Sequence, residues 1–282
     1  MTKEYRIEDL LSLMEKLRDP QFGCSWDRKQ SLRTLTGYTL EEVYEVIDAV
    51  ETGDDAQLQD ELGDLLFQVV FYAQIAKEEG RFEFSAVIGS ITEKLLRRHP
   101  HVFPDASLES FGNSELALNA EQVAQRWEEI KNEERAQKAD SGDAGTKPSV
   151  LDDIPSSLPA LDRARKLQKR AASVGFDWRE VQGVIAKVKE ELAELEAELG
   201  QGDQQRIEQE FGDLMFSCVN LARHLQIDPE SSLRGSNRKF EARFRGIENL
   251  ATDSGEGLKA LDESQLNALW NQVKATEIDS VK

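Results

Sequence analysis

The residues best placed to do chemistry are acids that recur at fixed intervals on two predicted helices. Glu191 and Glu194 lie three residues apart, and so do Glu210 and Asp213. Side chains at positions i and i+3 share one face of a helix. If the two helices pack antiparallel, the four carboxylates point at one spot, where their charges repel unless a cation lies among them. Hard oxygen ligands of this kind suit Mg²⁺ or Mn²⁺.

The same acidic pattern occurs a second time, earlier in the chain. It consists there of Glu42, Glu45, Glu61 and Asp64, with the further acid Glu41 directly before them. The interval between the two pairs is the same in both copies. A single E-x-x-E motif would be weak evidence in a chain so rich in glutamate, because such acids are usually solvated surface charges. Two copies of the whole pattern at identical spacing indicate metal sites.

Composition limits the classes of protein to consider. The chain has 282 residues, of which 39% are hydrophobic, enough for one large domain or two ordinary ones. With 35 basic and 54 acidic residues, its net charge of −19 argues against binding to nucleic acid or to an anionic membrane. It has two distant cysteines, no signal-peptide pattern after Met1 and no apolar run of membrane-spanning length. We therefore expect a cytoplasmic protein without disulfides.

Helices must position the acids, and the hydrophobic period predicts helices throughout the chain. We expect them over residues 7–17, 39–50 with Thr39 as N-cap, 57–80, 84–98, 121–139, 161–174, 181–199, 204–225, 232–250 and 263–277. No segment alternates like a strand, so the predicted fold class is all-α. The middle of the 57–80 helix, Leu65–Tyr72, is apolar nearly all round, which is typical of a helix buried in a bundle. Glu61 and Asp64 on its leading turns are therefore hard to explain as surface charges.

The chain divides into two halves that match along their length. We expect an N-terminal repeat over residues 1–139, a small and polar linker over 140–160, and a C-terminal repeat over 161–282. Each half also carries a Lys/Arg pair and a Trp/Lys pair with spacing i, i+4: Lys94 with Arg98 and Trp127 with Lys131, then Lys239 with Arg243 and Trp270 with Lys274. We interpret this as an internal duplication of one all-α unit.

Metal-binding carboxylates, nearby cations and an aromatic ring together suit the binding of a nucleotide polyphosphate. Lys239 and Arg243 share one helix face and could hold phosphate oxygens. Lys187 and Arg206, each four residues before an acid, could reach the phosphates too. Trp270 could stack on any nucleobase, although a tryptophan is as often a core or interface residue. The sequence has no glycine-rich phosphate loop, so helices must carry the site.

The histidines give little sign of a second kind of metal site. His99 and His101 flank a proline at a predicted helix end, where we expect them to cap and pack. His224 lies on an apolar helix and is expected to be a hydrogen-bonded core residue.

With these motifs the sequence resembles the MazG family of nucleoside triphosphate pyrophosphohydrolases, over almost the whole chain and in both repeats. The motifs that carry the resemblance are Gly23–Asp27, Thr39–Glu45, Glu61–Asp64, Arg97–Phe103, Gly175–Trp178 and the second acid set. The resemblance implies an all-α NTP pyrophosphatase fold, a homodimer, and Mg²⁺ held by the acids. It also implies attack of water at the α-phosphorus of an NTP or dNTP, which gives the monophosphate and pyrophosphate. Ser25 stands where the family's motif usually has proline, and we expect this to affect loop rigidity rather than chemistry.

The resemblance also implies roles for particular residues. The metal ligands and catalytic acids become Glu191, Glu194, Glu210 and Asp213, and the substrate contacts become Lys187, Glu190, Lys239, Arg243, Trp270 and Lys274. Both acid sets are complete, but the first repeat has Tyr38 and Gln57 at the positions of Lys187 and Arg206. We therefore expect the C-terminal repeat to be catalytic. The N-terminal repeat is then structural, regulatory or a second, weaker site.

The leading interpretation is a Mg²⁺-dependent hydrolase with broad choice among NTPs and dNTPs, ATP included, that serves nucleotide-pool housekeeping or a stress response. One alternative is a narrower enzyme for dUTP, dCTP or phosphoribosyl-ATP. Another is a helical adaptor that binds a regulatory protein without turnover. The preferred base and sugar, and the choice between Mg²⁺ and Mn²⁺, stay open at this stage.

Overall fold

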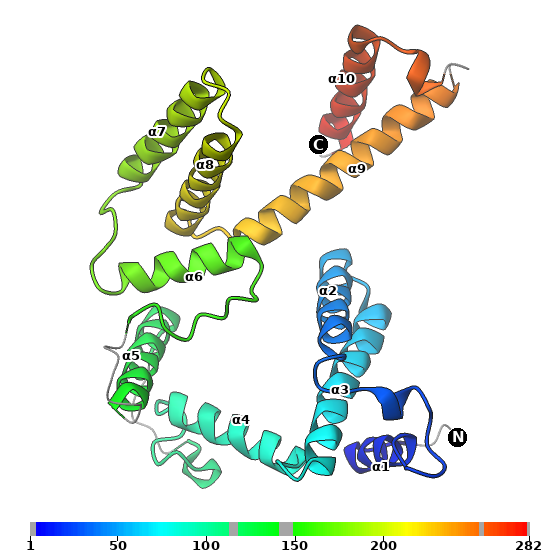
Figure 1. Cartoon of the computed structure of the whole chain (residues 1–282), viewed down its shortest axis with the longest axis vertical. Helices are drawn as coiled ribbons and strands as arrows, with labels where there is room; N and C mark the ends of the chain where they lie inside the picture. Colours follow the sequence, from blue (N-terminus) through cyan, green and yellow to red (C-terminus); the bar gives the residue numbers. More distant parts are fainter. Residues whose placement is uncertain (1–3, 113–117, 141–148, 254–256, 281–282) are drawn as a thin grey trace. The chain divides into compact units, whose positions relative to one another are not determined.

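The chain folds into two compact units, Met1–Gly142 and Asp143–Lys282, which are described separately (Figure 1). The computed structural model describes residues 4–112, 118–140, 149–253 and 257–280, with the backbone alone for 135–140 and 277–280. Within these residues every regular element is a helix. The division between the units falls inside the predicted 140–160 linker, of which residues 141–148 lie outside the described part.

The first unit is organised around a hairpin of two long helices. Its elements are α1 (Ile7–Leu17), the 3₁₀ turn η1 (Asp27–Lys29), α2 (Thr36–Thr52), α3 (Asp55–Glu78), α4 (Phe84–Arg98), η2 (Leu108–Ser110) and α5 (Ala120–Asp140). Helices α2 and α3 pack side by side, and α1 packs on α3 (Figure 1). Gly53 ends α2 with a φ of 74°, a conformation that suits glycine, and the Asp54 side chain then caps α3.

The core of the first unit lies where α1 meets α3. Its buried members are Met14, Leu35, Val70, Phe71 and Ile75. The apolar middle of the second long helix is thus buried on one face, with Val70 and Phe71, whereas Leu66 and Val69 on the other face are exposed, so the predicted burial nearly all round is wrong. The burial fixes α3 in place, and with it the acids on its leading turns.

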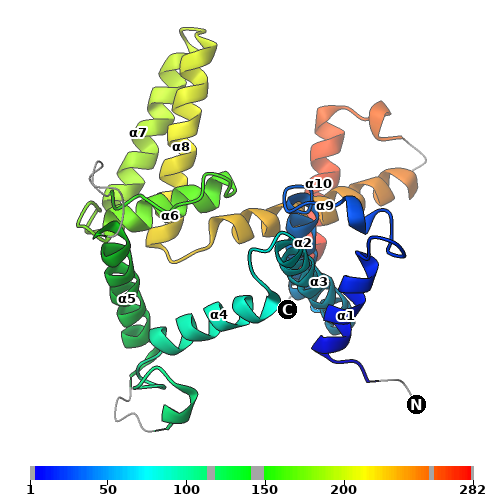
Figure 2. The ribbon, with the colours of Figure 1, turned by 60° about the horizontal axis from the view of Figure 1, so that its bottom comes forward.

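The second unit repeats the hairpin and extends it. Its elements are α6 (Ala160–Ala172), α7 (Val181–Leu199), α8 (Gln204–His224), α9 (Pro229–Asp253), η3 (Leu258–Ala260) and α10 (Glu263–Ser280). Helices α7 and α8 form the hairpin, α6 packs on α8, and α10 packs on α9. In both ribbon views α9 runs away from the α7–α8 pair and carries α10 with it (Figures 1 and 2). None of the helices in the described ranges has the length and apolarity needed to span a membrane.

Two predicted helix starts are wrong. Thr39 is not an N-cap, because α2 already begins at Thr36. The Thr39 hydroxyl instead donates to the Leu35 carbonyl oxygen and lies 2.9 Å from the Tyr72 hydroxyl. Helix α9 begins at Pro229 rather than Ser232, because the carboxylate of Asp228 caps it and proline is well tolerated in a first turn.

Replacement of Phe71 by alanine tests the importance of this core. Because the side chain is buried and also lies under the Arg18 guanidinium, its loss should lower the free energy of unfolding by about 3–5 kcal/mol. Urea denaturation followed by circular dichroism measures the change. Phe22→Ala is the matched control, since Phe22 is 83% exposed in the same unit and its loss should cost under about 0.5 kcal/mol. Equal effects of the two substitutions would contradict the assignment of the core.

Candidate metal centre

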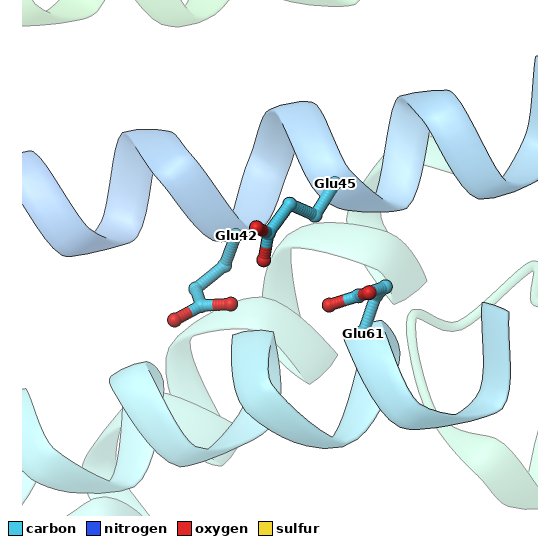
Figure 3. Close-up of side chains that lie close together, drawn as sticks. All are labelled: Glu42, Glu45 and Glu61. Carbon is cyan, nitrogen blue, oxygen red and sulfur yellow. The ribbon is translucent and has the colours of Figure 1, made fainter. Parts of the chain in front are cut away.

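The first hairpin brings three glutamates together between its helices. Glu42 and Glu45 reach from α2 toward Glu61 on α3 (Figure 3). One carboxylate oxygen of each lies within 4.8 Å of those of the other two. The arrangement follows from the i, i+3 spacing on α2 and from the short turn at Gly53 and Asp54, which sets the two helices side by side.

The second hairpin builds the same group from the matching residues. Glu191 and Glu194 on α7 meet Glu210 on α8, again with ligand atoms within 4.8 Å of one another. The turn between these helices is longer, because α7 ends with Gly200 as a right-handed C-cap, but it closes as the first does, with a left-handed glycine and a capping aspartate. Gly202 has a φ of 76°, and the Asp203 carboxylate accepts hydrogen bonds from the first turn of α8. Glu191 is the most buried of the three acids, with 5% of its surface exposed.

The fourth acid of each predicted set stands apart from its group. The sequence predicted that four carboxylates would converge, but neither Asp64 nor Asp213 belongs to the groups that the structure forms. An aspartate is one methylene shorter than a glutamate, so it extends less far from α3 or α8. Asp64 is still near enough for its charge to raise the pKa of Glu42.

Electrostatic repulsion within both groups is visible in the pKa values of their carboxyl groups. Loss of hydration raises the pKa of Glu45, and the charges of Glu61 and Glu42 raise it further. The pKa of Glu42 is raised mainly by desolvation. In the second repeat, desolvation followed by the charges of Glu191 and Glu210 raises the pKa of Glu194. Both groups therefore hold their negative charges at a cost that a cation would remove.

In the second repeat a lysine of the chain itself partly neutralises the acids. The ammonium of Lys187 lies 2.7 Å from Glu191 Oε1 and 2.9 Å from Glu190 Oε1. Hydrogen bonds to Glu191 and then Glu190 raise the pKa of Lys187. Lys187 and Glu190 were predicted as substrate contacts, and here Lys187 pairs both with Glu190 and with the buried Glu191.

One buried side chain of the first site was missed by the sequence reasoning. Gln68 on α3 donates from Nε2 to Glu42 Oε1 at 3.4 Å, and its Oε1 is buried without a hydrogen-bond partner. Its signal in the sequence was a single polar residue within the apolar run Leu65–Tyr72. A buried amide oxygen without a partner, on a side chain that contacts Glu42, is a further hard donor for a cation.

The donor atoms of both groups are chemically suited to a hard divalent cation. Each offers three carboxylates from two rigid helices. The first adds the orphaned amide oxygen of Gln68, and the second already attracts an ammonium ion to Glu191. Oxygen-only donors of this kind suit Mg²⁺ or Mn²⁺ better than softer metals.

The predicted substrate contacts on α9 and α10 form a separate cluster. The Arg243 guanidinium lies 5.5 Å from the centre of the Trp270 ring, which packs 5.8 Å from the ring of Phe240. Lys239 and Lys274 are exposed on the same two helices. Because α9 and α10 extend away from α7 and α8 (Figure 2), one chain does not bring this cluster to the acids.

Arg206 stays at the tip of the second hairpin. It lies on the first turn of α8, with Glu198 and Asp203 each 3.7 Å away. At these distances and with its side chain 60% exposed, the ion pairs are weak. The guanidinium is therefore free to change its rotamer at little cost, and its predicted contact with phosphates stays a prediction.

Two of the matching cations of the first repeat, Arg98 and Lys131, are engaged in ion pairs. Arg98 lies 2.6 Å from Glu134 on α5, and together with Arg97 it lowers the pKa of Glu134 to about 2. Lys131 pairs with Glu128 at 3.1 Å. The remaining predicted members are the exposed Glu41, the half-buried Lys94, and Trp127, whose ring packs edge-on against His99 at 5.1 Å. The predicted packing role of His99 is thereby confirmed.

The loop before the second hairpin is fixed by an ion-pair cluster that the sequence did not reveal. Asp177 accepts from both terminal nitrogens of Arg223 and lies 2.9 Å from His224 Nε2. These partners, Arg223 first, lower the pKa of Asp177. His224 is thus hydrogen-bonded, as predicted. Trp178 packs so closely on Gly183 that a Cβ there would lie 2.5 Å from the ring, so the glycine is required for this contact.

Comparison with known proteins gives consistent similarities over both repeats. The MazG nucleotide pyrophosphohydrolase domain matches residues 30–103 and, a second time, residues 179–246. The chain is 50% identical to the nucleoside triphosphate pyrophosphohydrolase of Escherichia coli K12, over 97% of this chain and 99% of that protein. It is 44% identical to the nucleoside triphosphate pyrophosphohydrolase/pyrophosphatase MazG of Thermotoga maritima, over 95% of each. It is also 40% identical to the uncharacterized protein YabN of Bacillus subtilis, of which it covers 51%.

The raised pKa values predict how the stability of the metal-free protein depends on pH. In the folded state Glu42, Glu45 and Glu194 bind protons more tightly than in the unfolded state, where their pKa is near 4.5. Just above that pH the folded state binds more protons, so stability falls as pH rises through the raised pKa values. Thermal unfolding of the metal-free protein should therefore occur at higher temperature near pH 5.5 than at pH 7.

At pH 7 a divalent cation should stabilise the folded protein, as protonation of the acids does at lower pH. Mg²⁺ at 100 times its Kd should stabilise the protein by about 2.7 kcal/mol per site. Glu194→Gln should stabilise the metal-free protein and weaken the response to Mg²⁺. Glu196→Gln is the matched control, because Glu196 is an exposed acid of α7 outside the group. A response to Mg²⁺ that is unchanged in Glu194→Gln would contradict the assigned metal centre.

Proposed function

The chain belongs to the MazG nucleotide pyrophosphohydrolase family, and from this premise we propose that its second repeat hydrolyses nucleoside triphosphates to the monophosphate and pyrophosphate with Mg²⁺. The protein is a nucleoside triphosphate pyrophosphohydrolase, a hydrolase of an acid anhydride bond. The observation that carries the assignment of the site is the group of Glu191, Glu194 and Glu210 between α7 and α8.

The acids of the second hairpin hold the cation at a fixed place between two helices. Mg²⁺ bound there would neutralise phosphate charge and promote attack of water at the α-phosphorus. Glu191 is buried and paired with Lys187, whereas Glu194 is exposed to solvent. Asp213, one helical turn after Glu210, remains a predicted ligand that its own variant must test.

A broad choice of base is supported by the aromatic cluster on α9 and α10. Trp270 and Phe240 offer ring faces beside the Arg243 guanidinium. Stacking on such rings tolerates every base, because each base has a π-face. Arg243 and Lys239 add positive charge where the triphosphate would extend. We therefore propose NTPs and dNTPs, ATP included, as substrates of a cytoplasmic housekeeping enzyme.

The difference between the repeats supports catalysis in the second. In the first repeat Arg98 is paired with Glu134 and Lys131 with Glu128, and Trp127 is packed against His99. In the second repeat Lys187 lies beside the acids, with Tyr38 at the corresponding position of the first. The first repeat keeps a carboxylate group, but Arg98 and Lys131, two of its three matching cations, are already paired with acids. We propose that it serves as a structural or regulatory metal site.

A homodimer would resolve the separation between the acids and the cations of the second repeat. The α7–α8 hairpin exposes apolar side chains over much of its length: Ile185, Leu192, Leu199, Phe211, Met215 and Phe216. Exposed apolar surface of this extent on one hairpin is typical of an interface. We propose that two copies pack through the hairpins, and that α9 and α10 of one copy approach the acids of the other.

Release of pyrophosphate tests the assignment of the active repeat. With Mg²⁺ and a panel of NTPs and dNTPs, Glu191→Gln should lower kcat/KM by at least 10²-fold, because it removes a ligand of the cation, and Asp213→Asn should do the same if Asp213 joins the group when the metal binds. Glu42→Gln should keep most of the activity. Reaction in ¹⁸O-labelled water should place the label on the monophosphate. Loss of activity in Glu42→Gln alone would move catalysis to the first repeat.

Mixing of two inactive variants tests the shared site. If the cations come from the partner, Glu191→Gln and Lys239→Ala/Arg243→Ala proteins, mixed after mild dissociation, should regain activity. One site of the mixed dimer then has its acids from one copy and its cations from the other, all intact. Without exchange, or if each chain completes its own site, the mixture stays as inactive as its components. Native mass spectrometry verifies that mixed dimers have formed.

A further inference from the structure

The position of one lysine distinguishes the acid groups of the two repeats. Lys187 lies four residues before Glu191 on α7, so that both side chains share a helix face. Its ammonium lies 2.7 Å from the Oε1 atom of Glu191, whose side chain is only 6% exposed. The same ammonium is 2.9 Å from the exposed Glu190. A buried acid of the cation site is thus already paired with a positive charge that belongs to the protein.

The corresponding place in the first repeat holds no cation. Tyr38 stands there, and its ring packs edge-on against Trp26 with 5.6 Å between centroids. Glu42, the counterpart of Glu191, accepts a long hydrogen bond from the neutral amide of Gln68, and Gln57 donates a similar one to Glu61. The first group therefore meets a divalent ion with neutral amides as its donors, whereas the second meets it with one carboxylate already paired with an ammonium.

We propose that Lys187 is a resident counter-ion that competes with the metal for Glu191 and makes metal binding in the second repeat depend on nucleotide. This inference rests on the proposed function. A divalent ion on Glu191 repels the ammonium beside it, so the metal binds weakly alone. The triphosphate gives the ammonium another anionic partner within reach of its flexible stem, and the metal then takes Glu191.

The consequence is a positive coupling between the two ligands. Because coupling between binding equilibria is reciprocal, nucleotide should tighten metal binding by the same factor by which metal tightens nucleotide binding. The first repeat, without the lysine, should take up metal in the absence of nucleotide. The two repeats of one chain would then respond to the same cation in different ways.

Calorimetric titration with Mn²⁺ tests the proposal without any turnover. The full chain carries Glu42→Gln and Glu61→Gln, so that only the second group binds metal. On this background Lys187→Met should bind Mn²⁺ about 10-fold more tightly than its parent, within the usual range of such couplings. Lys189→Met, which removes an exposed lysine of the same helix, is the matched control and should leave the affinity unchanged. Lys187→Arg retains the charge and should bind metal as weakly as the parent.

The same titration with an α,β-methylene nucleotide, which resists cleavage, completes the test. Nucleotide should tighten Mn²⁺ binding in the parent. The ratio of the Mn²⁺ affinities with and without nucleotide should fall toward one in Lys187→Met. Unchanged or weaker metal affinity in Lys187→Met would overturn the inference while leaving the proposed function intact. Absence of Mn²⁺ binding to the parent, with and without nucleotide, would overturn the proposed metal site and the inference together. Circular dichroism melts verify that each variant is folded.

Discussion

The constraint on which this structure depends is the repulsion among carboxylates that two antiparallel helices hold together. Both hairpins share three features: a left-handed glycine lies in the turn, the aspartate after it caps the second helix, and acids at i, i+3 face an acid across the gap. The helices are fixed by burial elsewhere, as the Phe71 core shows for α3. Because the helices hold the acids close together, a positive charge between them stabilises the folded state.

The two repeats relieve this repulsion differently, and the difference accounts for their proposed roles. In the second, the ammonium of Lys187 supplies part of the positive charge, and we propose that it can turn from Glu191 to the phosphates of a ligand. In the first, Arg97 and Arg98 of α4 pair with Glu134 on α5, and the acid group receives hydrogen bonds from the neutral amides of Gln57 and Gln68. Both copies of the duplicated unit thus have an acid group, and in the second copy a lysine lies beside it.

The sequence predicted what depends on local order and missed what depends on distance in three dimensions. Hydrophobic period and turn residues sufficed for helices such as 84–98 and 181–199, and the i, i+3 acids correctly indicated both carboxylate groups. The exclusion of Asp213 depends on side-chain length and helix rotation, which spacing does not encode. The direction of α9, which separates Arg243 from the acids, and the contact of Asp177 with Arg223 are set by long-range packing. Gln68 had a local signal, a polar residue in an apolar run, that becomes meaningful only once its neighbour Glu42 is known.

The central claim is that the cation used in hydrolysis is held by Glu191, Glu194 and Glu210. Anomalous diffraction from crystals grown with Mn²⁺ and an α,β-methylene nucleotide locates that ion without reference to any variant. The account predicts a strong anomalous peak among these three carboxylates, with the nucleotide's phosphates beside it. A nucleotide bound with its Mn²⁺ elsewhere, for example among Glu42, Glu45 and Glu61 alone, would contradict it.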